Sequence, residues 1–239
     1  MKKILFFLVA GALVAGFANA QEKKEKKEPI EGNGKKVTRD VTVSSFDVLK
    51  ANGVYELKLS QGDEESVRIE ADENLQDYFT VRNDGNKLII DMDKLKNIHL
   101  KNASKMKVYV TFKKLKELDL ETVGNVVSEE SLSFDHLDLN HRGVGNVDLK
   151  MNASKVEIAH SGVGNVKLSG KANEAVVKNS GVGSLQAGSF VVQTMNIENT
   201  GVGSAEVNAE KDLKVKDSFL GKVKNNGAAS ARKMNKVRV

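Results

Sequence analysis

Two histidines, His141 and His160, occupy the same place in a repeated motif of this 239-residue chain. Imidazole is the side chain best suited to binding a metal or moving a proton near neutral pH. A structural zinc takes four ligands and a catalytic zinc three, whereas the next residue at this repeat position is Asn179. The chain also has no cysteine, which excludes thiolate metal sites, disulfides and cysteine nucleophiles. We therefore expect no metal and no cofactor.

Carboxylate pairs are the second group that could carry chemistry, because glycan cleavage requires two positioned acids or an acid with a base. The adjacent pairs Glu64-Glu65 and Glu129-Glu130 stand in polar, turn-like segments rather than on strands. The nucleophile motif Gly-x-Ser-x-Gly is absent. The sequence predicts no catalytic residues and no enzyme. A carbohydrate-active β-helix enzyme, a lyase or hydrolase, stays open as an alternative.

Glycines recur with a period near twenty residues in the second half of the chain, most often as Gly-Val-Gly. The second glycine of each motif follows the last by 21, 19, 19, 20 and 18 residues. We interpret them as a structural ladder at which the backbone turns a corner. The ladder comprises Gly124, Gly143, Gly145, Gly162, Gly164, Gly181, Gly183, Gly201, Gly203 and Gly221.

A polar residue follows each second glycine, which predicts a second structural ladder of stacked side chains that hydrogen-bond along the repeat axis. Its members are Asn125, Asn146, Asn165, Ser184 and Ser204. Between the glycines stands an apolar residue, Val144 in one repeat and Val163 in the next, which we expect to point inward.

Apolar residues alternate with polar ones on both sides of the glycines, as in Leu137 and Leu139 before them and Val147 and Leu149 after them. Period-two alternation in short runs predicts strands with one buried face. Repetition in register favours a parallel β-helix of about 20-residue coils, each rising about 4.8 Å. An antiparallel meander is the alternative.

The first half of the mature chain is less regular but also alternates, so we predict an all-β protein throughout. The expected strands are 37–43, 54–59, 67–70, 87–92 and 106–112. The sequence Asn83-Asp84-Gly85-Asn86 indicates a hairpin turn.

The first twenty residues have the features of a secretory signal, with a basic start, an apolar stretch and a small-x-small site that ends at Ala20. Cleavage there leaves 35 basic and 32 acidic residues, a balance that gives no reason to expect nucleic acid. We expect a signal peptide at 1–20, a charged disordered tether at 21–36 and a basic tail at 224–239. The product would be periplasmic or on the cell surface, and not membrane-spanning.

The segment Phe46 to Gly62, the string Ala71-Asp72-Glu73-Asn74-Leu75 and the Gly-x-Gly-Asn/Ser repeats resemble the head GIN domain family of putative auto-transporter adhesins. The resemblance extends over 37–223, with the regular repeats at 113–223. It implies a right-handed, single-stranded parallel β-helix exported by bacteria, mostly Bacteroidota. It also implies a binding or adhesion module of the cell envelope, with a surface glycan or an envelope protein as partner. A ligand-free structural protein is a further alternative, and the oligomeric state is not indicated.

Overall fold

The computed structural model describes residues 29–95, 100–101 and 105–234. The expected signal peptide and the charged residues 21–28 lie outside this part of the chain. Strands dominate it, with two short 3-10 helices, η1 (Glu73–Tyr78) and η2 (Asp93–Leu95). The strands are β1 (Ile30–Glu31), β2 (Lys36–Val41), β3 (Val48–Val54), β4 (Glu56–Gln61), β5 (Ser66–Asp72), β6 (Thr80–Asp84), β7 (Lys87–Asp91), β8 (Leu100–Lys101), β9 (Lys107–Phe112), β10 (Glu117–Val123), β11 (Val126–Ser128), β12 (Leu132–His141), β13 (Val147–His160), β14 (Val166–Asn179), β15 (Leu185–Asn199), β16 (Ala205–Asp217), β17 (Val223–Asn225) and β18 (Ala231–Lys233).

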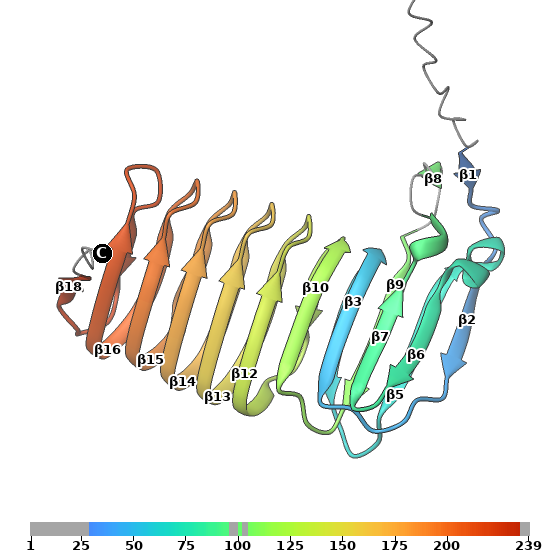
Figure 1. The fold of residues 1–239 in the computed structure, drawn as a ribbon, viewed down its shortest axis with the longest axis horizontal. Coiled ribbons are helices and arrows are strands. Elements are labelled where there is room, and N and C mark those ends of the chain that lie inside the picture. The colour runs from blue at the N-terminus through green and yellow to red at the C-terminus, as the bar shows by residue number, and fades with distance from the viewer. Residues whose placement is uncertain (1–28, 96–99, 102–104, 235–239) are drawn as a thin grey trace, which may run out of the picture.

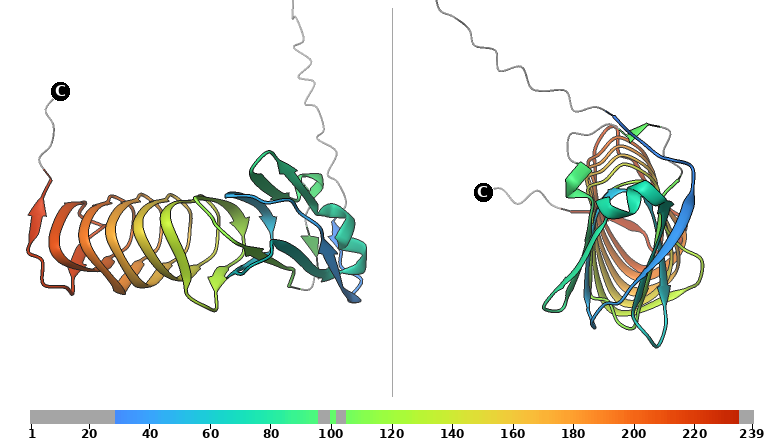
Figure 2. Two further views of the ribbon diagram at one scale, coloured as in Figure 1. Left: turned by 90° about the horizontal axis from the view of Figure 1, so that it is seen from below. Right: turned by 90° about the vertical axis from the view of Figure 1, so that its right-hand side faces the viewer.

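The repeats stack as the coils of a parallel β-solenoid (Figure 1). Strands β12 to β16 pair in parallel with their equivalents one coil away, so that Leu137 lies beside Val156 and Val156 beside Ala175. Viewed along the axis, the coils superimpose as a flattened loop (Figure 2). The parallel register confirms the predicted β-helix and excludes the antiparallel meander.

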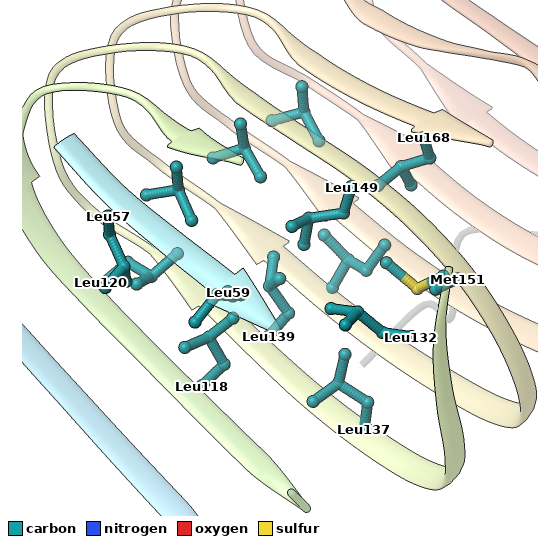
Figure 3. Close-up of a cluster of buried hydrophobic side chains, with 14 of the residues drawn as sticks. Leu57, Leu59, Leu118, Leu120, Leu132, Leu137, Leu139, Leu149, Met151 and Leu168 are labelled. Atoms are coloured by element: carbon teal, nitrogen blue, oxygen red, sulfur yellow. The ribbon is translucent and has the colours of Figure 1, made fainter. Parts of the chain in front are cut away.

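The interior of the solenoid is built from ladders of aliphatic side chains (Figure 3). Leu118, Leu139 and Ile158 stack in three successive coils and are at most 3% exposed. Burial of one such side chain contributes about 1.5–3 kcal/mol. Each interior coil contacts two neighbours, so the fold is held by the sum of these ladders rather than by one central core.

The irregular first half arises because the chain does not build its coils in sequence order. Strands β3 and β4 pair on one side with β10 and β11, and on the other with β7 and β9, which come later in the chain. Strand β2 then pairs antiparallel with β5, and β5 with β9, so this end of the solenoid is closed by antiparallel strands. The predicted hairpin is present as β6 and β7, with Gly85 at a φ of 60°.

The folded domain extends at both ends beyond the limits that the sequence suggested. Strand β1, inside the expected tether, pairs with β8. Strands β17 and β18 pair with β16, so the solenoid continues into the expected basic tail. The reason is that backbone hydrogen bonds can add a strand to the edge of a sheet whatever its side chains are. The expected domain limits, in contrast, were based on the hydrophobicity and charge of the side chains.

The residue between the glycines points outward, contrary to expectation. Val144, Val163 and Val182 are about half exposed, with values of 50%, 49% and 50%. Alternation continues without a break through the corner, so the glycines occupy the inward positions and the valine between them must face solvent. We name this row the valine ridge; it consists of Val54, Val123, Val144, Val163, Val182 and Val202.

Candidate functional site

The second glycines turn the corner in a conformation that L side chains rarely adopt. Their φ values lie between 134° and 148° at Gly124, Gly145, Gly164, Gly183 and Gly203. The coil below also leaves no room, because a Cβ built on Gly164 would lie 2.1 Å from the carbonyl oxygen of Gly145. Both facts make this position specific to glycine.

The first glycines are required for a different reason, since their φ values are not positive. A Cβ on Gly162 would lie 2.3 Å from the carbonyl oxygen of Gly143. On Gly181 it would also lie 2.6 Å from Nε2 of His160. The missing side chain therefore leaves space for the imidazole of the neighbouring coil.

The last motif departs from this arrangement. Phe219 takes the place of the first glycine and is 87% exposed, because the corner has no interior space for its ring. Gly221 does not have a positive φ, and its N–H donates to Oγ of Ser218 instead. The glycine ladder therefore loses its regular geometry in this coil.

Polar residues form a buried ladder inside the corner, two places before the first glycine. His141 and His160 are stacked with ring centroids 4.9 Å apart, and their Nδ1 atoms are separated by 2.9 Å. In the following coils, Nδ2 of Asn179 donates to Oδ1 of Asn199 over 2.6 Å. Burial lowers the pKa of His141 to about 4, with a smaller effect from the neighbouring ring, and it also lowers the pKa of His160. Each of these side chains contacts a ladder neighbour, while Nε2 of His141 and Nε2 of His160 are buried without a hydrogen-bond partner among the described residues.

The outward polar ladder joins consecutive coils through side-chain oxygens. Oδ1 of Asn125 accepts the N–H of Asn146, Oδ1 of Asn146 that of Asn165, and Oδ1 of Asn165 that of Ser184, over 2.9–3.0 Å. Within the described residues no such bond joins Ser184 to Ser204, and their shorter side chains continue the row.

A groove runs across the coils near the start of β12 and the middle of β13, β14 and β15, away from the glycine corner. Its volume is about 1040 Å³. The floor is apolar and comes from neighbouring coils, with Leu115, Phe134, Ala153 and Ala172 along it. Phe134, Ala153 and Ala172 are direct neighbours in register, so the interior ladder shrinks to a methyl group in two successive coils. This drop in side-chain size is a signal that the sequence carries and that hydrophobic alternation alone does not reveal.

Lysines surround this floor. Lys113 and Lys116 form ion pairs with Glu65 and Asp47, with N–O distances of 3.5 and 2.6 Å. Lys114 and Lys171 also line the groove, and no carboxylate within the described residues lies in ion-pair range of either. Two cations of the groove are therefore available to a ligand.

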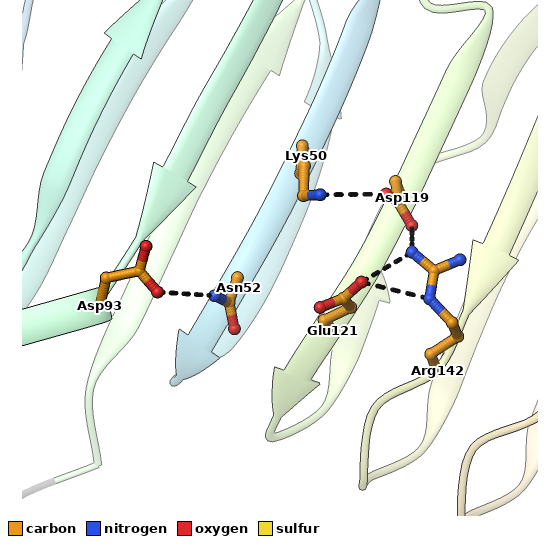
Figure 4. Close-up of polar contacts among 6 residues, drawn as sticks. All are labelled: Lys50, Asn52, Asp93, Asp119, Glu121 and Arg142. Carbon is orange, nitrogen blue, oxygen red and sulfur yellow. Dashed lines mark hydrogen bonds and ion pairs between the residues drawn. The ribbon is translucent and has the colours of Figure 1, made fainter. Parts of the chain in front are cut away.

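A second charged cluster, on β3, β10 and the segment after β12, differs because its charges are already satisfied (Figure 4). Arg142 donates to both Asp119 and Glu121, and Lys50 lies 3.8 Å from Asp119. The hydrogen bond to Glu121 raises the pKa of Arg142, and together with the charges of Asp119 and Glu121 it outweighs the opposing effect of burial. This cluster links neighbouring coils and offers no free charge.

One group of side chains has metal-ligating types that the sequence reasoning missed. Nε2 of His136 lies 3.0 Å from Oδ1 of Asp138 and 3.9 Å from Oε1 of Glu157. The register between β12 and β13 brings Glu157 beside Asp138, which only the coil geometry reveals. Nζ of Lys155 already lies 2.5 Å from Oε1 of Glu157, so a cation is present in the cluster. The four side chains are 37–51% exposed, and the arrangement is that of a surface charge network.

One residue of each acidic pair that could have served catalysis is engaged in an ion pair. Glu65 accepts from Oγ of Ser45 and pairs with Lys113, and Glu129 pairs with Lys58 over 2.9 Å. The Lys58 hydrogen bond and charge lower the pKa of Glu129, so it stays an ionised acceptor. The structure does not bring the two pairs together as an acid and a base.

Comparisons with known proteins agree with this geometry. The sequence model of a family described as "Putative auto-transporter adhesin, head GIN domain" matches residues 45–229. A putative adhesin from Bacteroides fragilis is 28% identical, with a TM-score of 0.72 and coverage of 86% of this chain and 100% of the other. A putative adhesin from Parabacteroides distasonis is 22% identical, with a TM-score of 0.66 and coverage of 87% and 95%.

A third solved structure, described as a putative lipid binding protein from Parabacteroides distasonis, is 20% identical, with a TM-score of 0.58 and coverage of 87% and 100%. At this identity the likeness shows the fold alone. Among curated proteins, no sequence matches the chain. Within the described residues, no helix has the length and hydrophobicity of a membrane span.

Proposed function

Because the chain belongs to the family of putative auto-transporter adhesins with a head GIN domain, we propose that it is an exported, non-enzymatic binding module of the bacterial cell envelope. The observation that carries this proposal is the groove across the coils, with its apolar floor and unpaired lysines. Concave sites with an apolar floor and a few polar groups are the usual form of a binding site.

The solenoid suits binding because most of its groove is formed by strand residues held in register, and only residues 113–116 of the lining belong to a connection between strands. Floor residues such as Phe134 and Ala172 are also part of the interior ladders, and Phe134 stacks on Phe112 with ring centroids 6.0 Å apart. A preformed site loses little conformational entropy on binding. The ligand would therefore meet an already ordered surface.

Non-enzymatic action is supported by the ion pairs of Glu65 and Glu129, one residue from each of the two adjacent acidic pairs. Glu65, beside Lys113, and Glu129, on Lys58, are acceptors in ion pairs. Neither has a raised pKa of the kind that a general acid for glycan cleavage requires. The proposed role is therefore recognition.

Export is supported by the signal-like residues 1–20 and by the adhesin family itself. We place the mature protein in the periplasm or on the cell surface, with cleavage after Ala20. A surface glycan or an envelope protein is the class of partner that such a location makes available.

A glycan array tests the proposal with the mature protein and two matched variants. Asn173→Trp places a large ring in the groove, whereas Asn196→Trp makes the same change at an exposed position of β15 that does not line it. We expect Asn173→Trp alone to abolish the binding of whichever glycans the wild-type protein retains. Release of new reducing ends or unsaturated products from those glycans would instead support an enzyme, and absence of any binding would favour a ligand-free structural protein.

A further inference from the structure

We infer that the groove binds a linear acidic polysaccharide whose carboxylates contact Lys114 and Lys171. This inference rests on the proposed binding function and names its ligand class. It follows from three properties of the groove: its length across several coils, the sign of its free charges and the kind of uncharged groups that line it.

The groove extends along the solenoid axis rather than into the protein. Its lining comes from the segment before β10 and from β12, β13, β14 and β15. These are successive coils, each about 4.8 Å from the next, so the groove is roughly 19 Å long. A site of this shape matches a chain molecule better than a single sugar or a small ion.

The groove carries a net positive charge, and only some of its lysines are engaged in ion pairs. Lysines 113, 114, 116 and 171 line it together with a single carboxylate, Asp135. Lys113 and Lys116 are held by Glu65 and Asp47, which leaves Lys114 and Lys171 without an ion-pair partner among the described residues. These two lie three coils apart, about 14 Å along the axis. Widely spaced single cations fit a polymer with intermittent negative charges.

In the coil of Lys171 and in the next coil, the groove presents uncharged hydrogen-bonding groups beside an apolar floor. The side chains of Asn173 and Gln193 line it and have no hydrogen-bond partner in the described part of the chain. Amides of this kind bind hydroxyl groups, and the floor at Ala153 and Ala172 suits the C–H face of a sugar ring. Cations alone would suit any polyanion, whereas this combination favours a glycan.

The amide of Gln61 has a different role, which keeps the groove in shape. Its Oε1 accepts the N–H of Ser133 over 2.8 Å, and its Nε2 donates to the carbonyl oxygens of Lys113 and Ser133. Gln61 therefore ties together two coils at the mouth of the groove and has no donor left for a ligand.

The test uses polygalacturonate as the acidic probe, with dextran as the neutral control and dextran sulfate as a dense polyanion. The variant Lys114→Gln/Lys171→Gln removes the two free cations. The control Lys178→Gln/Lys222→Gln removes two exposed lysines, also without ion pairs in the described structure, that do not line the groove. All four changes are at exposed residues, and thermal melting will verify that each variant is folded.

We expect the wild-type protein to bind polygalacturonate, and the groove variant to bind it roughly three- to tenfold more weakly, as the loss of two exposed charge contacts implies. The control should change affinity less than twofold, and added salt should weaken wild-type binding more than binding by the groove variant. Equal effects of the two double variants, or no binding of polygalacturonate, would overturn the inference.

The outcomes also separate this inference from the proposed function. If dextran binds and Asn173→Trp blocks it while the lysine variants have no effect, the groove is a binding site for another class of glycan. If dextran sulfate binds but polygalacturonate does not, the site recognises charge density, and the acidic glycan of spaced carboxylates is rejected. If no probe and no array glycan binds, both the inference and the proposed function fail.

Discussion

The Nδ1 atoms of His141 and His160 lie 2.9 Å apart inside the corner of the solenoid, with the two rings tilted by only 12°. A contact of this length requires one Nδ1 to donate and the other to accept, so two neutral rings must have opposite tautomers. Both side chains are at most 4% exposed, and no carboxylate belongs to their ladder neighbours Leu120 and Asn179. The pair is therefore stable only while it is uncharged.

Acid should destabilise the protein through this pair. Burial holds the pKa of His141 at about 4 and lowers that of His160, whereas both rings titrate near 6.5 in the unfolded chain. As the pH falls from 6.5 towards 4, the unfolded chain takes up protons that the folded chain does not. Stability is therefore complete above pH 6.5 and is lost below it, by about 2–3 kcal/mol for His141 between pH 7.5 and 4.5. Urea denaturation at the two pH values measures the loss.

The matched variant is His141→Asn/His160→Asn, which continues the amide ladder already present at Asn179 and Asn199. Carboxylates elsewhere respond to acid in both proteins, so the difference between their losses isolates the histidines. The double variant should lose clearly less stability than wild type between pH 7.5 and 4.5. An identical loss in the two proteins would contradict the assignment.

Replacement of Gly164 by valine should destabilise the fold by at least about 2 kcal/mol. The residue has a φ of 138°, and a Cβ would meet the Gly145 carbonyl oxygen at 2.1 Å, so strain and overpacking add. Ser161→Ala, in the same corner and exposed, should cost less than about 1 kcal/mol. Gly221→Val should be milder than Gly164→Val, because Gly221 lacks the positive φ. Denaturant melts compare the three, and a neutral Gly164→Val would refute the corner geometry.

The valine ridge predicts an unequal response to threonine. Val163 is 49% exposed and Val166, three residues later, is 1% exposed. Val163→Thr should change the free energy of unfolding by less than about 0.5 kcal/mol, since its hydroxyl stays in water. Val166→Thr buries an oxygen in the interior and should cost about 1–3 kcal/mol. Thermal melting distinguishes them, and a larger loss at Val163 would mean that the ridge faces inward after all.

The outward amide ladder predicts that the oxygen of Asn165 matters more than its nitrogen. Oδ1 of Asn165 accepts the N–H of Ser184 over 2.9 Å. Asn165→Ala should lower the free energy of unfolding by about 0.5–1.5 kcal/mol. Asn165→Asp keeps the acceptor oxygen and should therefore lower it much less. Equal losses in the two variants, measured by urea denaturation, would show that the bond contributes nothing to stability.

Export predicts the N-terminus of the mature protein. Expression of the full chain in a bacterium with an intact secretion system should give a protein that starts at Gln21, because the small residues Ala18 and Ala20 form the cleavage site. N-terminal sequencing of the fractionated protein measures this. A product that starts at Met1 in the cytoplasm would contradict the proposed export.

Much of the regular half could be predicted, because its repetition is a direct consequence of the fold. In a parallel solenoid every residue lies beside its own equivalent, so Leu139 meets Ile158 and Gly145 meets Gly164, and one repeat predicts the next. The same rule predicted the row of Asn125, Asn146 and Asn165. The irregular half could not be ordered in this way, because β3 pairs with both β7 and β10 and neither neighbour follows from the order of the chain.

The sequence by itself determined the all-β class, the repeat of about twenty residues with its glycines and the likeness to the family, because each depends on residue type and spacing along the chain. It favoured parallel coils, and the register of the strands then excluded the antiparallel alternative. Only the tertiary structure decided that the corner valines face solvent. It also decided that Nδ1 of His141 and Nδ1 of His160 share a hydrogen bond, and that Lys114 and Lys171 line the same groove. The physical reason is that burial and charge pairing depend on neighbours one or more coils away. The period places those neighbours side by side, and the three-dimensional path of the backbone decides whether solvent or protein lies between them.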